Sequence, residues 1–321
     1  MKTISVSTFF FGCLFCLGGS LLAKGPVNQK GPIKLALNWK AEPQFGGFFA
    51  AVEKGFFKAE GLDVEILEGG SGAPTIQMLA AGKVDYAIVS GDEIILSHDR
   101  GASDILALFA TFQTNPAAIM THTGRGFKTL QDVFANDGVL LWQSGLPYAQ
   151  FLQKKYGPGK VKTAPYLGGI GNFANDQKIS QQCFITSEPL LAEKQKIKVK
   201  SFLIADSGFN PYTTVLSVKA ARLKSDEEEV KKMVKAVRLG WQEYLRDPKA
   251  TNLYMGKLNK AMDSITFESS AKAQIALIQI DAGKGTLGNM TSARWQALAQ
   301  QLLDLKVIKQ RPSPESLFHN Y

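Results

Sequence analysis

The sequence predicts an α/β protein of two lobes, each built from a sheet and helices, and three observations support this fold class. From residue 33 onward, short apolar runs alternate with segments of helical periodicity, the pattern of βαβ units on a mainly parallel sheet. Two Asn-Pro steps bracket a second, smaller block of the same kind. The chain of 321 residues is also long enough for two domains of roughly 100 to 200 residues each.

The first lobe begins as a regular series of predicted strands and helices. Gly55, Gly82 and Gly101 stand where its helices should end, because glycine enters the left-handed conformation without Cβ strain. The expected strands are 33–38, 62–67, 84–89 and 105–112, and the expected helices are 45–54, 74–81 and 92–99.

The second lobe is predicted between Asn115-Pro116 and Asn210-Pro211. Proline holds the preceding residue extended and removes a ladder donor, so each step is suited to a crossover between lobes. We therefore assign 33–115 and 212–321 to lobe 1 and 116–211 to lobe 2. In lobe 2 the expected strands are 117–121, 138–142, 161–166, 182–185 and 199–205, and the expected helices are 130–135, 147–156, 173–180 and 189–195.

The C-terminal part is predicted to be mainly helical and to cover the sheet of lobe 1. Ser225 and Glu228 have the spacing of a capping box, and Pro248 should end the helix that follows. One strand is expected at 213–218, further helices at 267–282 and 292–303, and a polar tail at 310–321.

The N-terminus has the features of an export signal. Lys2 is followed by an uncharged run that reaches Leu22, with small residues up to Ala23. Polar residues interrupt the run, which is marginal for the ~20 apolar residues of a membrane span, so we favour a cleaved signal peptide (1–23) over a retained anchor. A linker is expected at 24–32. Lipid modification of Cys13 or Cys16 is the other alternative, and the predicted location is the periplasm.

Composition argues against several other classes of protein. Of three cysteines only Cys183 lies beyond the predicted leader, so no internal disulfide is expected. The formal net charge is +9, but the 37 Lys and Arg residues are spread among 28 acidic residues and form no long basic block. We therefore expect no nucleic-acid partner. His98, His122 and His319 belong to no motif, and beyond the predicted leader the sequence has no Cys-x-x-Cys or His-x-x-x-His spacing. We therefore expect no catalytic centre, metal or cofactor.

Ligand-binding residues are expected beyond the carboxyl ends of the strands, where open α/β sheets hold their ligands. The aromatic and polar side chains there would form a slot suited to a flat heterocycle. The loop at 69–73 partly matches a nucleophile elbow and the loop at 169–174 partly matches a dinucleotide fingerprint. We interpret both as loops whose glycines let the backbone approach a ligand closely. The candidates are Asn38, Trp39, Gln44, Ser71, Gly72, Ser90, Asp92, Asn115, Gln143, Ser144, Tyr166, Gly169, Glu188, Asn210 and Tyr212.

Six segments of the chain together carry a resemblance to one known family: 37–39, 45–51, 53–58, 60–64, 81–86 and 184–189. They follow one another as in the thiamine-pyrimidine-synthase-like and alkanesulfonate-binding-like solute receptors, and the resemblance extends over nearly the whole chain after the predicted leader. It implies a type II periplasmic-binding-protein fold, in which a hinge joins two lobes and traps the ligand between them. It also implies that Trp39 stacks on the ligand ring and that Glu188 accepts hydrogen bonds from an amino group.

The resemblance implies a function and a rival. Its transport members serve importers whose permease and ATPase are separate chains, so we expect a monomeric, non-enzymatic binding component of an ABC importer for a thiamine-pyrimidine-precursor-like ligand. Other members are enzymes that build the thiamine pyrimidine from their own histidine and pyridoxal phosphate, using an iron-binding cysteine cluster. Here 40–45 lacks histidine and 211–217 lacks cysteine, which argues against the synthase. A periplasmic sensor domain is also compatible with the sequence.

Overall fold

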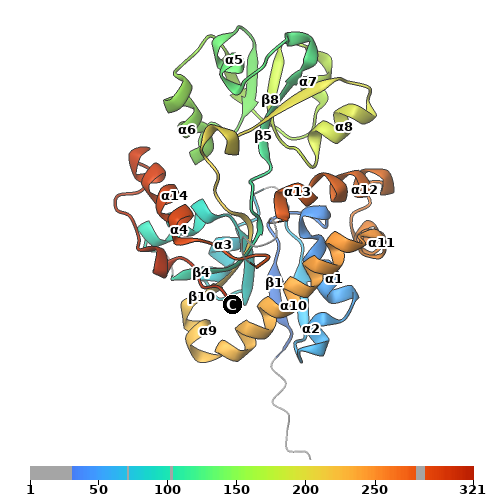
Figure 1. The fold of residues 1–321 in the computed structure, drawn as a ribbon, viewed down its shortest axis with the longest axis vertical. Coiled ribbons are helices and arrows are strands. Elements are labelled where there is room, and N and C mark those ends of the chain that lie inside the picture. The colour runs from blue at the N-terminus through green and yellow to red at the C-terminus, as the bar shows by residue number, and fades with distance from the viewer. Residues whose placement is uncertain (1–30, 71, 102–103, 280–285) are drawn as a thin grey trace, which may run out of the picture. The chain divides into compact units, whose positions relative to one another are not determined.

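Two five-stranded sheets organise the chain after residue 31 (Figure 1). The computed structural model describes residues 31–70, 72–101, 104–279 and 286–321. The predicted signal peptide (1–23), most of the predicted linker (24–32) and the candidate Ser71 lie outside the described residues. Among the helices in the described ranges, none has the length and apolar character needed to cross a membrane.

The first sheet has the strand order β2-β1-β3-β10-β4. Strand β1 pairs in parallel with β2 and β3, whereas β10 runs antiparallel to both β3 and β4. The late strand β10 therefore returns into the sheet formed by the first part of the chain. These strands are β1 (Ile33–Ala36), β2 (Val64–Leu67), β3 (Tyr86–Val89), β4 (Ile105–Phe112) and β10 (Thr213–Lys219).

The second sheet repeats this arrangement with the order β7-β6-β8-β5-β9. Strand β6 is parallel to β7 and β8, and β5 is antiparallel to β8 and β9. Two α/β lobes with one topology confirm the predicted fold class, while the lobe boundaries at 115/116 and 211/212 remain our proposal. The strands are β5 (Ala117–His122), β6 (Val139–Trp142), β7 (Lys162–Pro165), β8 (Ile179–Phe184) and β9 (Val199–Leu203).

Helices cover both faces of the first sheet (Figure 1). Along β3, Ala87 and Val89 pack in one apolar core and Tyr86 and Ile88 in the other, because successive side chains of a strand alternate between faces. One face carries α3 (Thr75–Ala80), α4 (Gly91–Asp99) and α14 (Ser292–Asp304). The other carries α1 (Gly46–Glu53), α2 (Phe56–Ala59), α10 (Glu227–Arg246), α11 (Lys249–Leu258), α12 (Ser264–Ala273) and α13 (Ile275–Ile278).

The second sheet is also covered on both faces. Trp142 and Leu140 of β6 share a core with α5 and α6, whereas Leu141 packs with α7 and α8. These helices are α5 (Leu130–Ala135), α6 (Pro147–Tyr156), α7 (Gly171–Asn175) and α8 (Glu188–Lys194).

Helix α10 packs tightly on α1 because glycines remove side chains from the contact. A Cβ atom built on Gly240 would lie 2.1 Å from the carbonyl oxygen of Gly47, and a Cβ on Gly47 would lie 2.2 Å from the Trp241 ring. A larger residue at Gly240 would push against the backbone of α1, and one at Gly47 would displace the Trp241 ring. The glycines predicted at helix ends, Gly55 and Gly82, have the expected positive φ of 74° and 67°, as does Gly101 at 62°.

The N-terminus of α10 differs from the sequence prediction. Ser225 is not its cap, because Ser225 belongs to the preceding helix α9 (Ala220–Ser225) and donates back to the Arg222 carbonyl. The cap is Asp226, whose side chain accepts the Glu229 N–H at 3.1 Å. The predicted end is confirmed, since α10 ends at Arg246 just before Pro248.

Three further local predictions were wrong. The helix expected at 173–180 ends at Asn175, because Asp176 is extended (φ −137°, ψ 111°) and a turn at 177–178 then leads into β8. The helix expected at 267–282 is divided at Gln274 into α12 and α13. The expected tail at 310–321 docks on β4: Leu317 is fully buried, and the Ala107 N–H donates to its carbonyl at 2.9 Å.

Candidate ligand-binding site

A cavity of about 190 Å³ is lined by residues of both lobes. The first lobe contributes the N-terminus of α4, the second contributes the ends of β6 and β8, and both crossover segments lie between them. Five predicted candidates meet here: Ser90, Asp92, Asn115, Gln143 and Glu188. The remaining lining residues are Ala117, Ala118, Leu146, Tyr148, Gln182, Cys183, Phe184, Ile204, Phe209, Pro211 and Thr213.

Asp92 brings a carboxyl group into the cavity from the first lobe. Its helix α4 begins with a capping box, in which the Ser90 N–H donates to Glu93 Oε2 at 2.8 Å. The Ser90 hydroxyl lies 2.6 Å from Asp92 Oδ1. Burial raises the pKa of Asp92, and burial together with the Asp92 charge raises the pKa of Glu93. The positive end of the α4 helix dipole partly offsets the cost of burying these two carboxyl groups in their charged form.

Glu188 brings the second carboxyl group, from the first turn of α8. Its two oxygens are held by separate donors: the Tyr166 hydroxyl at 2.7 Å and the Phe184 N–H at 2.8 Å. Burial, and then the nearby Glu188 charge, raise the pKa of Tyr166 and of the buried Cys183 thiol. The orientation of Glu188 is therefore fixed before any ligand arrives.

Trp39, Glu42 and Gln44 form a cluster on the first lobe. Trp39 Nε1 donates to Glu42 Oε1 at 3.0 Å and Gln44 Nε2 donates to Glu42 Oε2 at 3.1 Å. Burial raises the pKa of Glu42, and the charge of Glu188 raises it further. The cluster therefore lies within electrostatic range of the second lobe's carboxylate, although it does not line the 190 Å³ cavity.

Sequence reasoning missed three of these polar residues. Glu42 stands between two candidates, Trp39 and Gln44, and that proximity was the available signal. Tyr148 and Gln182 lie inside a helix and a strand, so a search of strand ends does not find them. Their own contact is short, because the Tyr148 hydroxyl donates to Gln182 Oε1 at 2.6 Å. Gln182 Oε1 also accepts the N–H of the candidate Gln143 at 2.7 Å, which fixes the loop after β6.

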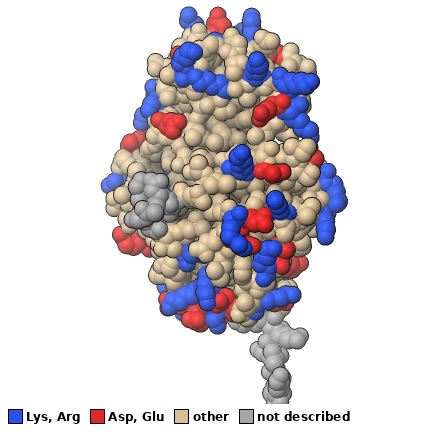
Figure 2. Space-filling view, turned by 45° about the vertical axis from the view of Figure 1, so that its right-hand side comes forward, with Lys and Arg blue, Asp and Glu red and all other residues tan. Residues whose placement is uncertain are grey.

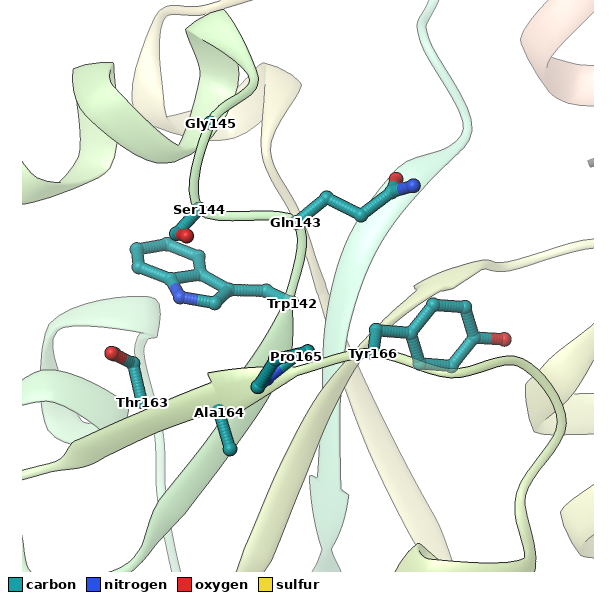
Figure 3. Close-up of a pocket in the computed structure, with 8 residues that line it drawn as sticks. All are labelled: Trp142, Gln143, Ser144, Gly145, Thr163, Ala164, Pro165 and Tyr166. Carbon is teal, nitrogen blue, oxygen red and sulfur yellow. The ribbon is translucent and has the colours of Figure 1, made fainter. Parts of the chain in front are cut away.

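A second cavity, of about 310 Å³, lies at the edge of the second sheet (Figure 3). It includes the candidates Gln143, Ser144 and Tyr166, whose neighbours in the lining are Trp142 and Thr163. In Figure 3 the Gln143 and Tyr166 side chains extend away from the side that holds Trp142. Although this cavity is larger, it is lined by one lobe alone and by no charged side chain in the described residues. The smaller cavity is therefore the better candidate site.

Asn115, Asn210 and Tyr212 hold the two crossover segments together. Asn210 Oδ1 accepts the Asn115 N–H at 2.9 Å and Arg294 Nη2–H at 3.0 Å. The Arg294 guanidinium lies 3.8 Å above the Tyr212 ring. Asn115 Nδ2 also donates to the Pro211 carbonyl at 3.1 Å. Of the three candidates only Asn115 lines the cavity, whereas Asn210 and Tyr212 belong to the hinge.

The remaining described candidates line neither cavity. Asn38 precedes Trp39 in the loop after β1, and Gly72 has a φ of 75° in the loop before α3. The Gly169 carbonyl accepts the Gln181 side chain at 3.0 Å.

The histidines lie outside the cavity. His122 is buried, stacks on Phe173 at 4.0 Å and places Nε2 2.8 Å from the Phe173 carbonyl oxygen. His98 Nε2 lies 2.9 Å from the Ile105 carbonyl oxygen. Among the side chains that the structure describes, no group of three or more His, Cys, Asp and Glu could hold a metal ion.

Two α/β lobes of one topology, joined by two crossovers and enclosing a cavity, define a periplasmic-binding-protein fold. Residues 42–251 match the NMT1/THI5-like family, and the chain belongs to it. The predicted fold is confirmed by its likeness to the periplasmic aliphatic sulphonate binding protein SsuA from Escherichia coli, with a TM-score of 0.66 over 89% of this chain and 92% of that one. At 10% identity this likeness establishes the fold alone.

Two curated relatives carry different names. The riboflavin-binding protein RibY of Chloroflexus aurantiacus is 22% identical over 230 residues, which cover 67% of this chain and 63% of RibY. The 4-amino-5-hydroxymethyl-2-methylpyrimidine phosphate synthase THI11 of Saccharomyces cerevisiae is 33% identical over 69 residues, 22% of this chain and 20% of the enzyme. The chain thus matches less than two thirds of the length of either relative.

Proposed function

We propose that this protein captures a small organic solute between its lobes and delivers it to an ATP-driven importer. The cavity lined from both lobes carries this proposal, with Asp92 on one side and Glu188 on the other. Only a ligand that contacts both lobes can favour a closed arrangement, since a ligand shifts an equilibrium by its difference in affinity for the two states. The structural likeness to a periplasmic solute-binding protein supports this role. The permease and the ATPase would be separate chains, and the protein would act as a periplasmic monomer.

The proposed ligand is a flat heterocycle that bears an amino group, similar to a thiamine-pyrimidine precursor. Trp39 offers a half-exposed ring whose indole N–H is held by Glu42. Glu188 offers carboxylate oxygens that are already oriented. The names of RibY and THI11 support a nitrogen heterocycle, because the first is named for binding riboflavin and the second for synthesising a pyrimidine phosphate.

A pyrimidine-forming enzyme is the second candidate, and the identity to THI11 over 69 residues favours it. Residues 40–45, beside the candidate Trp39, contain no histidine that such chemistry would consume. Incubation of the purified protein with pyridoxal phosphate and iron tests the two directly. An aldimine absorbance and release of a pyrimidine would favour the enzyme, and their absence would favour binding.

The test of the binding role is mass spectrometry of the small molecules that purified protein releases on denaturation, followed by calorimetry with the molecule identified. The variant Glu188→Gln should weaken binding, because it removes the charge of an oriented carboxylate. Glu193→Gln, an exposed position on the same helix, is the matched control and should bind as the unchanged protein does. Failure to retain or bind any small molecule would contradict the proposal.

A further inference from the structure

Both sides of the cavity between the lobes carry acidic groups. Asp92 lines it from the first lobe and Glu188 from the second, and none of the described residues in its lining is lysine, arginine or histidine. In the part of the chain that the structure describes, neither carboxylate belongs to an ion pair. A buried carboxylate without a cationic partner is costly, so a ligand that supplies the cation gains interaction energy at this site.

Two basic residues of the first lobe, Arg294 and Lys40, do not line the cavity. Arg294 donates to the Asn210 carbonyl at 2.8 Å and to the Gln113 carbonyl at 2.5 Å. Lys40 is exposed and lies near Glu42, whose pKa its charge lowers slightly against the dominant effect of burial. An anionic ligand such as a sulfonate would therefore meet two carboxylates without a guanidinium or ammonium among the described lining residues.

The volume and the lining residues of the cavity further restrict the class of ligand that it can bind. Its volume of about 190 Å³ is below the roughly 300 Å³ at which pockets for drug-sized ligands begin. Tyr148, Phe184 and Phe209 contribute aromatic rings to the lining. Aromatic faces attract cations as well as flat apolar groups. A molecule with one ring and one positive charge fits the small volume, the aromatic residues and the acidic groups of this cavity.

The net charge of the protein does not determine whether the cavity prefers a cation or an anion. The chain has a net charge of +9, which would favour anions at long range. On the face shown in Figure 2, however, Lys and Arg side chains are scattered among Asp and Glu rather than gathered around one opening. Charges beyond the Debye length of about 8 Å are largely screened at physiological salt. The carboxylates inside the cavity therefore dominate what a bound molecule experiences.

We propose that the molecule bound between the lobes is a small single-ring cation, held by Asp92 of the first lobe and Glu188 of the second. This inference rests on the proposed binding function. The same contacts explain how the ligand would favour closure, because a cation attracts a carboxylate on each lobe. Without the cation, the charge of Glu188 acts on Glu42 across the lobes and adds to the larger effect of burial in raising the pKa of Glu42.

The test uses three molecules of nearly the same shape and different charge: benzamidine (cation), benzamide (neutral) and benzoate (anion). Their dissociation constants at pH 7 are measured by calorimetry, or by ligand-observed NMR where binding is weak. We expect benzamidine to bind at least tenfold more tightly than either of the others. Asp92→Asn and Glu188→Gln should each weaken benzamidine binding by about 10- to 100-fold, as loss of a hydrogen bond to a charged group does. The exposed positions Asp63→Asn and Glu193→Gln serve as controls and should leave the preference unchanged.

Different results would overturn different claims. Benzamide or benzoate binding as tightly as benzamidine would overturn the inference and leave the binding role in place. So would a benzamidine preference that persists in both variants. If none of the three binds and no small molecule is released on denaturation, the proposed function itself fails. Circular dichroism of Asp92→Asn and Glu188→Gln checks that both variants remain folded.

Discussion

Replacing Arg294 by methionine tests whether the two crossover segments are held by one half-buried side chain. The guanidinium donates to Asn210 through its carbonyl (2.8 Å) and its Oδ1 (3.0 Å), and to the Gln113 carbonyl (2.5 Å). It also stacks on Tyr212 at 3.8 Å. Methionine fills much of the same space and removes all of these donors.

The expected loss follows from the groups left without a partner. The Asn210 and Gln113 carbonyl oxygens would each lose a donor. Because both residues are only partly buried, we expect about 1–2 kcal/mol for each, the lower part of the range for buried groups. Losing the stacking on Tyr212 adds about 0.5–2 kcal/mol. Burial lowers the pKa of Arg294, so part of this cost is recovered when the buried charge is removed. We expect the free energy of unfolding to fall by about 3 kcal/mol.

Urea unfolding followed by circular dichroism measures this difference. The exposed Arg311→Met is the control and should change the free energy of unfolding by less than about 0.5 kcal/mol. A loss below about 1 kcal/mol in Arg294→Met would refute the reasoning, because it would mean that water or other donors satisfy the crossover carbonyls.

Three other perturbations have expected outcomes. Gly240→Ala should lower the free energy of unfolding by about 1–3 kcal/mol through overpacking against α1. Gly256→Ala is the control and should not destabilise the protein, because its added Cβ has no neighbour closer than 3.8 Å. Equal stability of the two variants in urea would contradict the packing argument. The hydrogen bond from Lys194, followed by that from the Thr266 N–H, lowers the pKa of Asp263 to about 2. The stabilising contribution of the Asp263 carboxylate should therefore be full above the usual pKa near 4 and decline as pH falls toward 2, and it should be smaller in Lys194→Gln. Because both side chains are about half exposed, we expect at most about 1 kcal/mol in acid titration of stability, and a Lys194→Gln protein with the same pH profile would disprove the link. Burial raises the pKa of Cys183, so a thiol reagent at pH 8 should react with it far more slowly in the native than in the denatured protein. Rapid reaction of the native protein would show that the reagent reaches the thiol from the cavity that Cys183 lines.

The architecture was predictable because it depends on local pattern. Alternation of strand and helix segments reflects which faces are buried, and the Asn-Pro steps restrict the backbone where the chain passes between sheets. The docking of Leu317 beside Ala107 was not predictable, because it joins segments about 200 residues apart and depends on an edge strand that a single sequence does not reveal. The cap of α10 was predicted wrongly for a related reason. Ser225 is the last residue of α9, so Asp226 and not Ser225 caps the next helix.

The candidate site was only partly accessible from the sequence. Residues that follow strands, such as Ser90 and Gln143, were found because the carboxyl ends of strands meet at one edge of a sheet. The same criterion selected Asn210, which the structure places in the hinge, because a strand-end position does not say whether a side chain turns inward or binds its neighbours. Tyr148 and Gln182 reach the cavity from within regular elements, where alternation of side chains and helix position, not proximity to an end, decides exposure.

The distance between the lobes tests the central claim most directly. Spin labels at Glu193→Cys on the second lobe and Lys260→Cys on the first occupy exposed positions, and native Cys183 is buried. With the molecule released from purified protein added back, electron-electron resonance should show one short, narrow distance distribution, and the ligand-free protein should show a longer or broader one. An identical distribution in both states, in samples where calorimetry confirms binding, would contradict capture by closure of the lobes.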